Sequence, residues 1–243
     1  EIKTVGLRRS LAISYERLGD ISRDKDRLEE AKDYHRQALE LHRQLYEENK
    51  TIEAQEGLAV SYDRLGDICK AQGRLEEAKG YYQKALALCR QLCGKTGAVK
   101  ARRDLGTVYG SLGDISRAQG HLAEAKEYYG KSLELRKQLC QETGTIDSRQ
   151  GLAVCYDQLG NVSQEEDHLA EARTYYLRGL EVSRQLCQET PTPQARKGLA
   201  IFREKLGDIN RVERNLDEAK AYHLQGMELR RQLCRETNTI ESR

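Results

Sequence analysis

Seven cysteines and five histidines carry the side chains that could bind a metal ion or act as nucleophile and base in this sequence. Cys89 and Cys93 are four residues apart, so a helix would place both thiols on one face, where they could share a metal ion. A zinc site needs about four ligands, and no second ligand pair occurs near these two cysteines. The sequence therefore predicts no metal site and no other cofactor.

The histidines do not form a catalytic arrangement. His121 and His168 are 47 residues apart, at a position that holds arginine in two other copies of a repeated pattern. His35 and His223 replace the second tyrosine of a Tyr-Tyr pair in that pattern, so we expect them in a half-buried core. The sequence contains no phosphate-binding loop, zinc motif or nucleophile with a neighbouring base. We therefore predict no catalytic residue and no enzyme activity.

The repeated pattern is clearest from Leu65 to Leu92, in the stretch LGDICKAQGRLEEAKGYYQKALALCRQL. Five copies follow one another at a spacing of 47 residues without insertion or deletion, and they begin at Leu11, Leu58, Leu105, Leu152 and Leu199. A fixed period in this range predicts a solenoid, in which each repeat is stabilised by stacking on the next.

We predict a single repeat domain over residues 1–243. Its repeats are expected at about residues 4–50, 51–97, 98–144, 145–191 and 192–238, numbered here as repeats 1 to 5. The last residues, TIESR at 239–243, match TIDSR at 145–149, where a helix is expected to begin. They are interpreted as the beginning of a further helix, so the chain is expected to be part of a longer protein.

Each repeat is predicted to contain two helices. In repeat 2, Leu58, Tyr62, Leu65 and Cys69 form one stripe at the helical period. In repeat 5, Thr192 can cap a helix whose first residue is Pro193. This placement predicts first helices at about 5–23, 52–70, 99–117, 146–164 and 193–211, and an all-α fold of ten helices.

A second apolar stripe predicts the second helix of repeat 2 from about Leu75 to Cys93. The turn before it carries residues that tolerate a left-handed backbone, namely Asp26, Gly73, Gly120 and Asp167 in repeats 1 to 4. Repeat 5 has Arg214 followed by Asn215, which allows its turn to differ by one residue.

A Leu-Gly pair recurs inside every predicted first helix, as in Leu65-Gly66. Glycine in the middle of a helix costs about 1 kcal/mol relative to alanine, so its repetition indicates a close contact between helices. We expect the partner of Gly66 to be a small residue of the second helix, Ala78, and equivalent alanines in the other repeats.

Four cysteines, Cys93, Cys140, Cys187 and Cys234, occupy one position of the repeat. Successive copies of that position lie at least one helix-packing distance apart, roughly 8 to 10 Å, whereas a disulfide needs Cα atoms within about 7 Å. We therefore expect free thiols that act as small apolar core residues.

The charge and hydropathy of the chain exclude several classes of partner. It has 41 basic and 39 acidic residues, a net charge of +2, and the two signs alternate along the chain. Nucleic-acid binding is not predicted, because a basic surface is missing. No apolar run reaches the roughly 18 to 20 residues that cross a bilayer, and the N-terminus does not resemble a secretory signal. We therefore expect no membrane partner and a cytoplasmic location.

The recurring residues resemble the tetratricopeptide repeat, whose pattern is an aromatic, Leu-Gly, Gly, Ala, an aromatic and Ala. In repeat 2 these are Tyr62, Leu65-Gly66, Gly73, Ala78, Tyr82 and Ala85. The resemblance covers nearly the whole chain. The period is longer than the common one, and the proline that usually ends the second helix is missing, as in the long-helix variants of kinesin light chains and bacterial repeat proteins.

The resemblance implies a right-handed superhelix whose concave groove, lined by the first helices, binds a peptide or a partner protein. Groove positions carried over from the family form three rows, four and then three residues apart. Row 1 holds Glu16, Asp63, Asp157 and Glu204. Row 2 holds Asp20, Asp67, Asp114, Asn161 and Asp208. Row 3 holds Arg23, Lys70, Arg117 and Arg211, with Gln164 in repeat 4.

Chaperone-binding members of the family use lysine and asparagine at these positions to hold a C-terminal carboxylate. This chain has acidic residues in two of the rows, so we expect it to lack that clamp. A basic or mixed-charge segment is the expected ligand by complementarity. The alternative is that acidic and basic rows form a solvated ladder of ion pairs within each helix, each pair worth about 0.2 to 0.5 kcal/mol.

The sequence therefore predicts a non-catalytic scaffold that binds a peptide or protein segment in its groove. The alternative, from a different class, is a structural spacer or self-assembly module in which the end repeats of different copies stack. An enzyme is expected only through a domain outside these residues.

Overall fold

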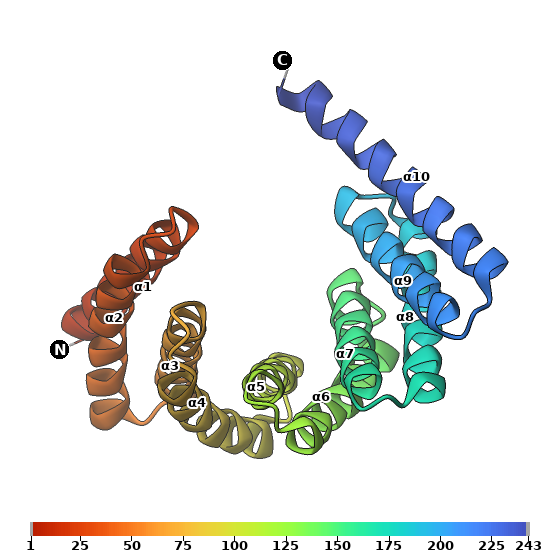
Figure 1. The fold of residues 1–243 in the computed structure, drawn as a ribbon. Coiled ribbons are helices and arrows are strands. Elements are labelled where there is room, and N and C mark those ends of the chain that lie inside the picture. The colour runs from red at the N-terminus through yellow and green to blue at the C-terminus, as the bar shows by residue number, and fades with distance from the viewer. Residues whose placement is uncertain (1, 242–243) are drawn as a thin grey trace. The chain divides into compact units, whose positions relative to one another are not determined.

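The computed structural model describes the backbone of residues 2–241 and the side chains of residues 5–236, and all regular structure in that part of the chain is α-helical (Figure 1). The all-α prediction is therefore confirmed. The ten helices are α1 Ile2–Asp24, α2 Leu28–Asn49, α3 Ile52–Ala71, α4 Leu75–Thr96, α5 Val99–Ala118, α6 Leu122–Thr143, α7 Ile146–Glu165, α8 Leu169–Glu189, α9 Pro193–Val212 and α10 Leu216–Glu241. Odd-numbered helices are the first helices of the repeats.

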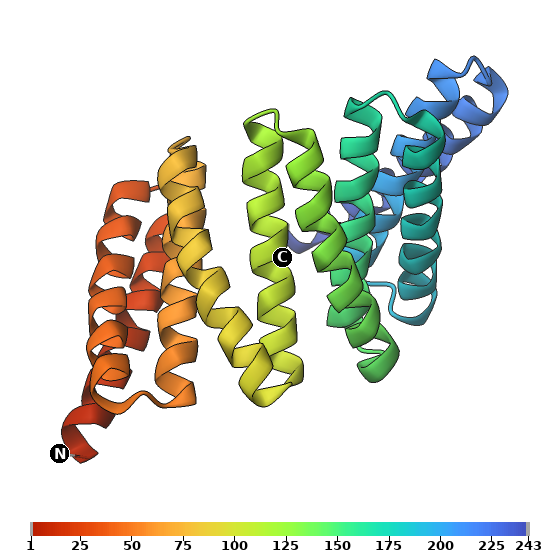
Figure 2. The same cartoon turned by 90° about the horizontal axis from the view of Figure 1, so that it is seen from below.

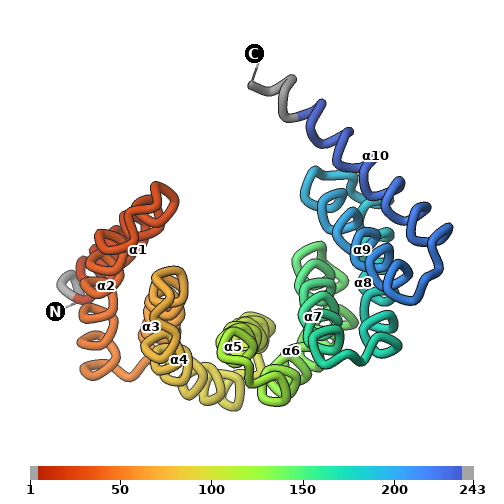
Figure 3. Tube along the Cα trace, in the orientation of Figure 1, coloured from red at the N-terminus to blue at the C-terminus, as the bar shows by residue number. Residues whose placement is uncertain are grey.

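The chain divides into two compact units, residues 1–128 (unit 1) and 129–243 (unit 2), with the boundary inside α6. In unit 1, each helix from α1 to α5 packs against the next one along the chain. The same holds in unit 2 from α7 to α10. Neighbouring helices are antiparallel within each unit, as seen from below in Figure 2 and along the backbone trace in Figure 3. Each unit thus positions its first helices as a separate set.

Threonine caps explain why three of the first helices begin where the sequence predicts. Thr51, Thr145 and Thr192 each accept a hydrogen bond from the backbone N–H three residues later, at 3.2 Å. Such a cap satisfies one of the N–H groups that have no partner inside the helix. Pro193 follows Thr192 as the first residue of α9.

The turn between the two helices has the same backbone in all repeats. Asp26, Gly73, Gly120, Asp167 and Arg214 have φ angles between 59° and 78°. The turn of repeat 5 therefore does not differ from the others by a residue. The backbone N–H after Arg214 donates to the carbonyl five residues earlier at 2.8 Å, as in the equivalent turn after Gly73 at 2.9 Å, and this hydrogen bond holds arginine in the left-handed conformation.

The glycine of four Leu-Gly pairs lies against a ring of the second helix, not against the alanine that we expected. A Cβ atom on Gly66 would lie 2.5 Å from the ring of Tyr82, and one on Gly160 would lie 2.3 Å from the ring of Tyr176. Both rings are fully buried. His35 and His223 take the place of these tyrosines against Gly19 and Gly207. The glycine is needed because the ring occupies the space of its side chain.

The predicted core stripes are largely buried, but the recurring cysteine position is not. Leu58, Leu65 and Cys69 of α3 are buried, and so are the residues of the α4 stripe from Ala78 to Leu92. All seven cysteines are free thiols, but those of the recurring position are not core residues. Cys93, Cys140 and Cys187 are half-buried and Cys234 is exposed, because they lie in the last turns of the second helices.

Ion pairs connect successive repeats within each unit. The ammonium of Lys32, whose side chain is 2% exposed, donates to both carboxylate oxygens of Glu77 at 2.9 and 3.0 Å. Lys79 contacts Glu124 in the same way at 3.3 Å. These residues belong to a Glu-Ala-Lys or Glu-Ala-Arg sequence that opens every second helix. The glutamate of one repeat thus holds the lysine of the preceding one.

The described backbone of α10 continues to Glu241, where the sequence pattern predicts a loop and the beginning of a further helix at residues 239–243. The expected break is therefore not present in residues 239–241, and the last two residues lie outside the described part. Residues 234–241 contain no proline or glycine, so no helix-breaking residue interrupts the described backbone of α10 up to Glu241.

Among the described helices, none combines the length and the apolar composition that crossing a membrane requires.

Candidate functional site

Two residues of row 2 accept a hydrogen bond from a tyrosine of the second helix of their own repeat. The hydroxyl of Tyr82 donates to Asp67 at 2.7 Å, and the hydroxyl of Tyr176 donates to Asn161 at 2.9 Å. Burial and the Asp67 carboxylate raise the pKa of Tyr82, so the hydroxyl stays a proton donor. In repeats 1 and 5 a histidine replaces the tyrosine, and its Nε2 lies 3.8 Å from a row 2 carboxylate in the pairs His35–Asp20 and His223–Asp208.

Two carboxylates of row 1 contact a nitrogen-bearing side chain 26 residues later. Nε2 of His42 lies 3.2 Å from Oε1 of Glu16, and Nη2 of Arg230 lies 2.6 Å from Oε2 of Glu204. The first pair belongs to repeat 1 and the second to repeat 5. A side chain of the second helix therefore covers the row 1 carboxylate in these two repeats.

Repeats 2 and 4 have small residues at that position of the second helix. Cys89 and Ser183 stand where His42 and Arg230 stand in repeats 1 and 5, and they face Asp63 and Asp157 of row 1 across a cavity. Each cavity lies between consecutive first helices, at the same positions of the repeat. Space is left because neither a thiol nor a hydroxyl is long enough to fill the place of an imidazole or a guanidinium group.

The cavity of unit 1 is acidic and has a volume of about 250 Å³. Its apolar wall comes from α3, α4 and α5, through Ala59, Val60, Leu92 and Val108. Its charged side chains are Glu56, Asp63, Arg64, Asp67 and Asp104. We call it the acidic cavity. Four carboxyl groups and one guanidinium group therefore surround an apolar floor.

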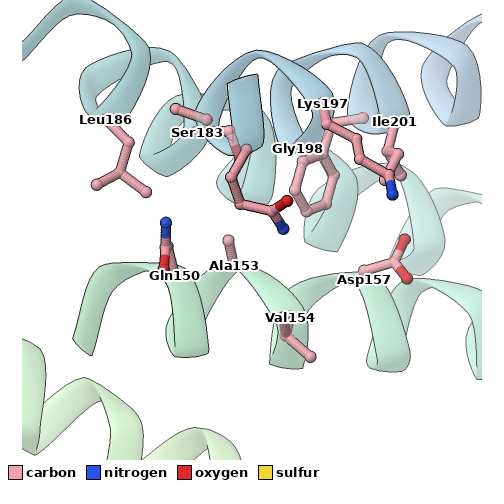
Figure 4. A pocket seen from close by; sticks show the side chains of 12 residues that line it. Gln150, Ala153, Val154, Asp157, Ser183, Leu186, Lys197, Gly198 and Ile201 are labelled. Atoms are coloured by element: carbon pink, nitrogen blue, oxygen red, sulfur yellow. The ribbon is translucent and has the colours of Figure 1, made fainter. Parts of the chain in front are cut away.

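The cavity of unit 2 is mainly apolar and has a volume of about 170 Å³. Val154 of α7, Leu186 of α8, and Ile201 and Phe202 of α9 supply most of its wall. Lys197 and Asp157 lie at one end of this cavity and Leu186 at the other (Figure 4). We call it the apolar cavity. Gly198 lies 3.7 Å from Ser183 when a Cβ is added to it, so both facing residues are small.

Burial changes the protonation of the acidic cavity. Desolvation raises the pKa of Asp63 to about 7, and the neighbouring carboxylates of Asp67 and Asp104 add to the rise, while Arg64 and Lys70 oppose it. Desolvation also raises the pKa of Asp104, against the opposing effect of Lys100 and Arg103. Oδ1 of Asp63 is buried and accepts no hydrogen bond from the protein. Asp63 is therefore a carboxyl group whose charge is poorly compensated at neutral pH.

The basic residues of row 3 form some of the expected pairs within a helix. Arg23 lies 3.3 Å from Asp20, and Arg211 lies 3.6 Å from Asp208. Lys70 instead lies 3.3 Å from Asp114 of the next repeat, and Arg117 lies in the last turn of α5. Rows 2 and 3 thus contain a partial ladder of ion pairs, part of it between repeats.

Sequence reasoning located the rows but missed the two cavities. Their signal is present in the sequence, as a small residue 26 positions after a row 1 carboxylate, but it is recognisable only once the structure shows that these positions face each other. Gly57 lies against His42, and a Cβ there would be 2.4 Å from the imidazole. The residue at the position of His42 thus differs in size between repeats, and the acidic and apolar cavities are lined by the small ones, Cys89 and Ser183.

Comparison with protein families supports the interpretation of the repeats. A family model described as tetratricopeptide repeat matches residues 10–68 and 58–125, and a second model with the same description matches residues 152–191. Together these matches cover more than half of the chain. A comparison with curated proteins gave no match.

Solved structures with the same fold have low sequence identity to this chain. BtubC (BKLC) from P. vanneervenii is 17% identical with a TM-score of 0.64, and the match covers 93% of this chain and 92% of that one. A Podosopora anserina putative kinesin light chain with nearly identical TPR-like repeats is 14% identical with a TM-score of 0.66, over 93% and 97%. The apo form of RapI is 12% identical with a TM-score of 0.59, over 93% and 85%.

Proposed function

Because the chain belongs to the tetratricopeptide repeat family, we propose that it is a non-catalytic scaffold that binds an extended peptide or protein segment along its first helices. The observation that carries this proposal is the pair of cavities between consecutive first helices, α3 and α5 in unit 1 and α7 and α9 in unit 2. Each cavity has the size of one or two side chains. A bound segment would insert side chains there, while its backbone follows rows 1 and 2.

The charges favour a basic or mixed-charge segment. The acidic cavity has an excess of carboxyl groups, and the apolar cavity has a lysine and an aspartate at one end. A ligand with a basic and an apolar side chain would complement both. Most row 2 residues already contact a side chain of the second helix. Their carboxylates would therefore attract a basic ligand through their charge more than through direct hydrogen bonds.

A peptide array that varies charge and apolar content tests this function, followed by binding measurements on selected peptides. Val154 lines the apolar cavity and is 54% exposed, so Val154→Glu is expected to weaken binding of a peptide that inserts an apolar side chain without unfolding unit 2. Leu177→Glu is the matched control, because Leu177 is 44% exposed on α8 and does not line either cavity. Charge reversal at Asp67 is less suitable, because it also removes the acceptor of Tyr82.

Absence of any selected peptide, or equal binding by the wild type and Val154→Glu for peptides with apolar side chains, would contradict this function. If Val154→Glu and Leu177→Glu both weakened peptide binding, the peptide would contact a surface other than the apolar cavity.

A second candidate function is self-association through the end repeats. Leu11, Leu18 and Ile21 of α1 are 46%, 42% and 51% exposed, whereas their counterparts in α3, Leu58, Leu65 and Ile68, are 5%, 0% and 0% exposed. Met227 of α10 is 41% exposed, whereas its counterpart Leu86 is 8% exposed. The exposed faces of α1 and α10 carry the same kinds of apolar side chain that are buried where successive repeats pack together. We therefore expect α10 of one copy to pack on α1 of another.

Light-scattering mass measured against concentration separates the two functions. Growth of the mass with concentration that Ile21→Glu abolishes would support self-association, and a mass that stays monomeric at all concentrations would rule it out. Glu30 of α2 and Lys220 of α10 occupy the repeat positions of Glu77 and Lys32, so we expect them to form an ion pair between two associated copies. Lys220→Glu alone should therefore weaken association, and the double variant Glu30→Lys with Lys220→Glu should preserve it.

A further inference from the structure

We propose that the acidic cavity of unit 1 is a subsite for a lysine side chain of the bound segment, in which the ammonium group pairs with Asp63. This inference rests on the proposed function and names the chemistry that one of its cavities recognises.

The internal repeats indicate what is missing from this cavity. In repeats 1 and 5, the row 1 carboxylate faces a nitrogen-bearing side chain of the second helix, in the pairs Glu16–His42 and Glu204–Arg230. In repeat 2 the carboxylate remains as Asp63, but the nitrogen-bearing side chain is replaced by Cys89. Burial raises the pKa of the Cys89 thiol to about 12, so this residue is neutral. An ammonium group supplied by a ligand would give Asp63 the nitrogen partner that the protein itself supplies in repeats 1 and 5.

The other carboxyl groups of the cavity have partners in the protein. Lys100 contacts Glu56, and Tyr82 donates to Asp67 at 2.7 Å. Nε of Arg103 lies 3.9 Å from Asp104. Oδ1 of Asp63 is buried and accepts no hydrogen bond. Since a buried acceptor without a donor costs about 1 to 3 kcal/mol, this oxygen is the atom that gains most from a ligand.

The shape of the cavity favours lysine over other cations. Val60, Leu92 and Val108 form an apolar wall beside Asp63, which suits the four methylene groups of a lysine. Arginine prefers both oxygens of a carboxylate at once, whereas an ammonium group can donate to a single oxygen from any direction. A metal ion would need several ligand atoms close together. Among the described residues, the three-residue group that meets this condition is Glu166, His168 and Glu171, at the turn before α8, and not the acidic cavity.

Binding of an ammonium group should release a proton. Asp67, Arg64 and Lys70 face Asp63 from its own helix, Asp104 faces it from α5, and Tyr82 and Cys89 face it from α4. The pKa of Asp63 is about 7 in the free protein, so a substantial fraction is protonated at neutral pH. Because only the ionised carboxyl attracts an ammonium group, affinity should increase as the pH rises from 6 to 8.

The experiment uses acetyl-Ala-Lys-Ala-amide as the probe and follows the methyl NMR signals of Val60 and Val108 in the full chain. Saturable shifts are expected with this peptide, and not with the same peptide carrying acetyl-lysine, norleucine or arginine. Asp63→Asn keeps the side-chain shape and is expected to weaken binding by about tenfold, the size of a charge-assisted hydrogen bond, and to abolish the pH dependence. Asp157→Asn, at the equivalent position of unit 2, should leave both unchanged.

Two results would overturn the inference. One is equal affinity of the wild type and Asp63→Asn for the lysine peptide, with both proteins folded. The other is equal affinity for the lysine, acetyl-lysine and arginine peptides. If array peptides still bind and depend on Val154 in either case, the proposed function stands and only the lysine subsite is wrong. If no array peptide binds at all, the proposed function fails, whatever the short probe does.

Discussion

A ring of the second helix determines where the first helix must carry glycine. Tyr82 is fully buried, donates its hydroxyl to Asp67, and lies in the space that a side chain at Gly66 would occupy. The sequence reveals the repeated glycine and indicates a close contact, but it does not show which residue makes that contact. Alanine was the expected partner because small residues allow helices to approach. The ring is the partner because its flat face fits over a glycine.

This packing predicts that Gly66→Ala destabilises unit 1. The new Cβ would lie 2.5 Å from the buried Tyr82 ring, and overpacking of this kind costs about 1 to 3 kcal/mol. Gly80→Ala is the matched control, because nothing lies within 4 Å of a Cβ there, and it should stabilise α4 by about 1 kcal/mol through helix propensity. Urea unfolding of both variants measures the difference. Equal stability of the two would contradict the ring contact.

Asp63 predicts a loss of stability as the pH rises from its unfolded-state pKa to its folded-state pKa. Its pKa is raised from 3.8 in the unfolded chain to about 7 in the folded protein. The folded state therefore binds more protons than the unfolded state between these values, and the free energy of unfolding should decrease as the pH rises from about 4 to about 7. Asp63→Asn should flatten this part of the profile. Chemical denaturation at a series of pH values tests it, and identical profiles for wild type and Asp63→Asn would contradict the burial of this group.

At the scale of helices, the ends were predictable because each is determined locally. Threonine caps, Pro193 and the left-handed turn residues lie next to the helix ends that they fix. Arg214 shows the limit of this reasoning, because its left-handed conformation is imposed by the backbone hydrogen bonds of the turn and not by its own preference. The ion pairs between repeats were not predictable from one repeat, because Lys32 and Glu77 are 45 residues apart and meet only when two second helices stack.

Lys32 is buried between the stacked second helices, whereas Glu77 is partly exposed. Removing the charge of Glu77 should therefore destabilise the protein more than removing that of Lys32. Glu77→Gln leaves the ammonium group of Lys32 buried without a counter-charge and should cost about 3 kcal/mol. Lys32→Met should cost less, because the Glu77 side chain is 37% exposed and can be hydrated. Glu30→Gln, at the same position of repeat 1, is the control and should change stability by less than about 0.5 kcal/mol. Denaturant unfolding at neutral pH compares the three variants.

The same pair contributes to acid sensitivity. The hydrogen bond from Lys32 lowers the pKa of Glu77 in the folded state, so its stabilising effect is present above the ordinary pKa of 4.5 and is lost as the pH falls through the lowered value. If Lys32→Met destabilised the protein more than Glu77→Gln at neutral pH, the pairing of a buried Lys32 with a partly exposed Glu77 would be contradicted.

At the scale of the whole molecule, the repeated sequence supports two compact units whose first helices carry similar but chemically different cavities. The rows of candidate residues were predictable, because the family pattern places them on the first helices. The cavities were not, since each is lined by a small residue, Cys89 or Ser183, at the position that holds His42 and Arg230 in repeats 1 and 5. The difference between an acidic and an apolar cavity follows from substitutions at equivalent positions, Asp104 in one and Gly198 in the other.

Methyl NMR mapping of a peptide selected by the array tests binding on the first helices most directly. We expect shifts concentrated on Val60 and Val108 around the acidic cavity, and on Val154 and Ile201 around the apolar cavity. The exposed methyl groups of Leu177 and Leu224 on the second helices α8 and α10 should not move. Shifts confined to second helices, with the cavity residues unchanged, would contradict peptide binding along the first helices.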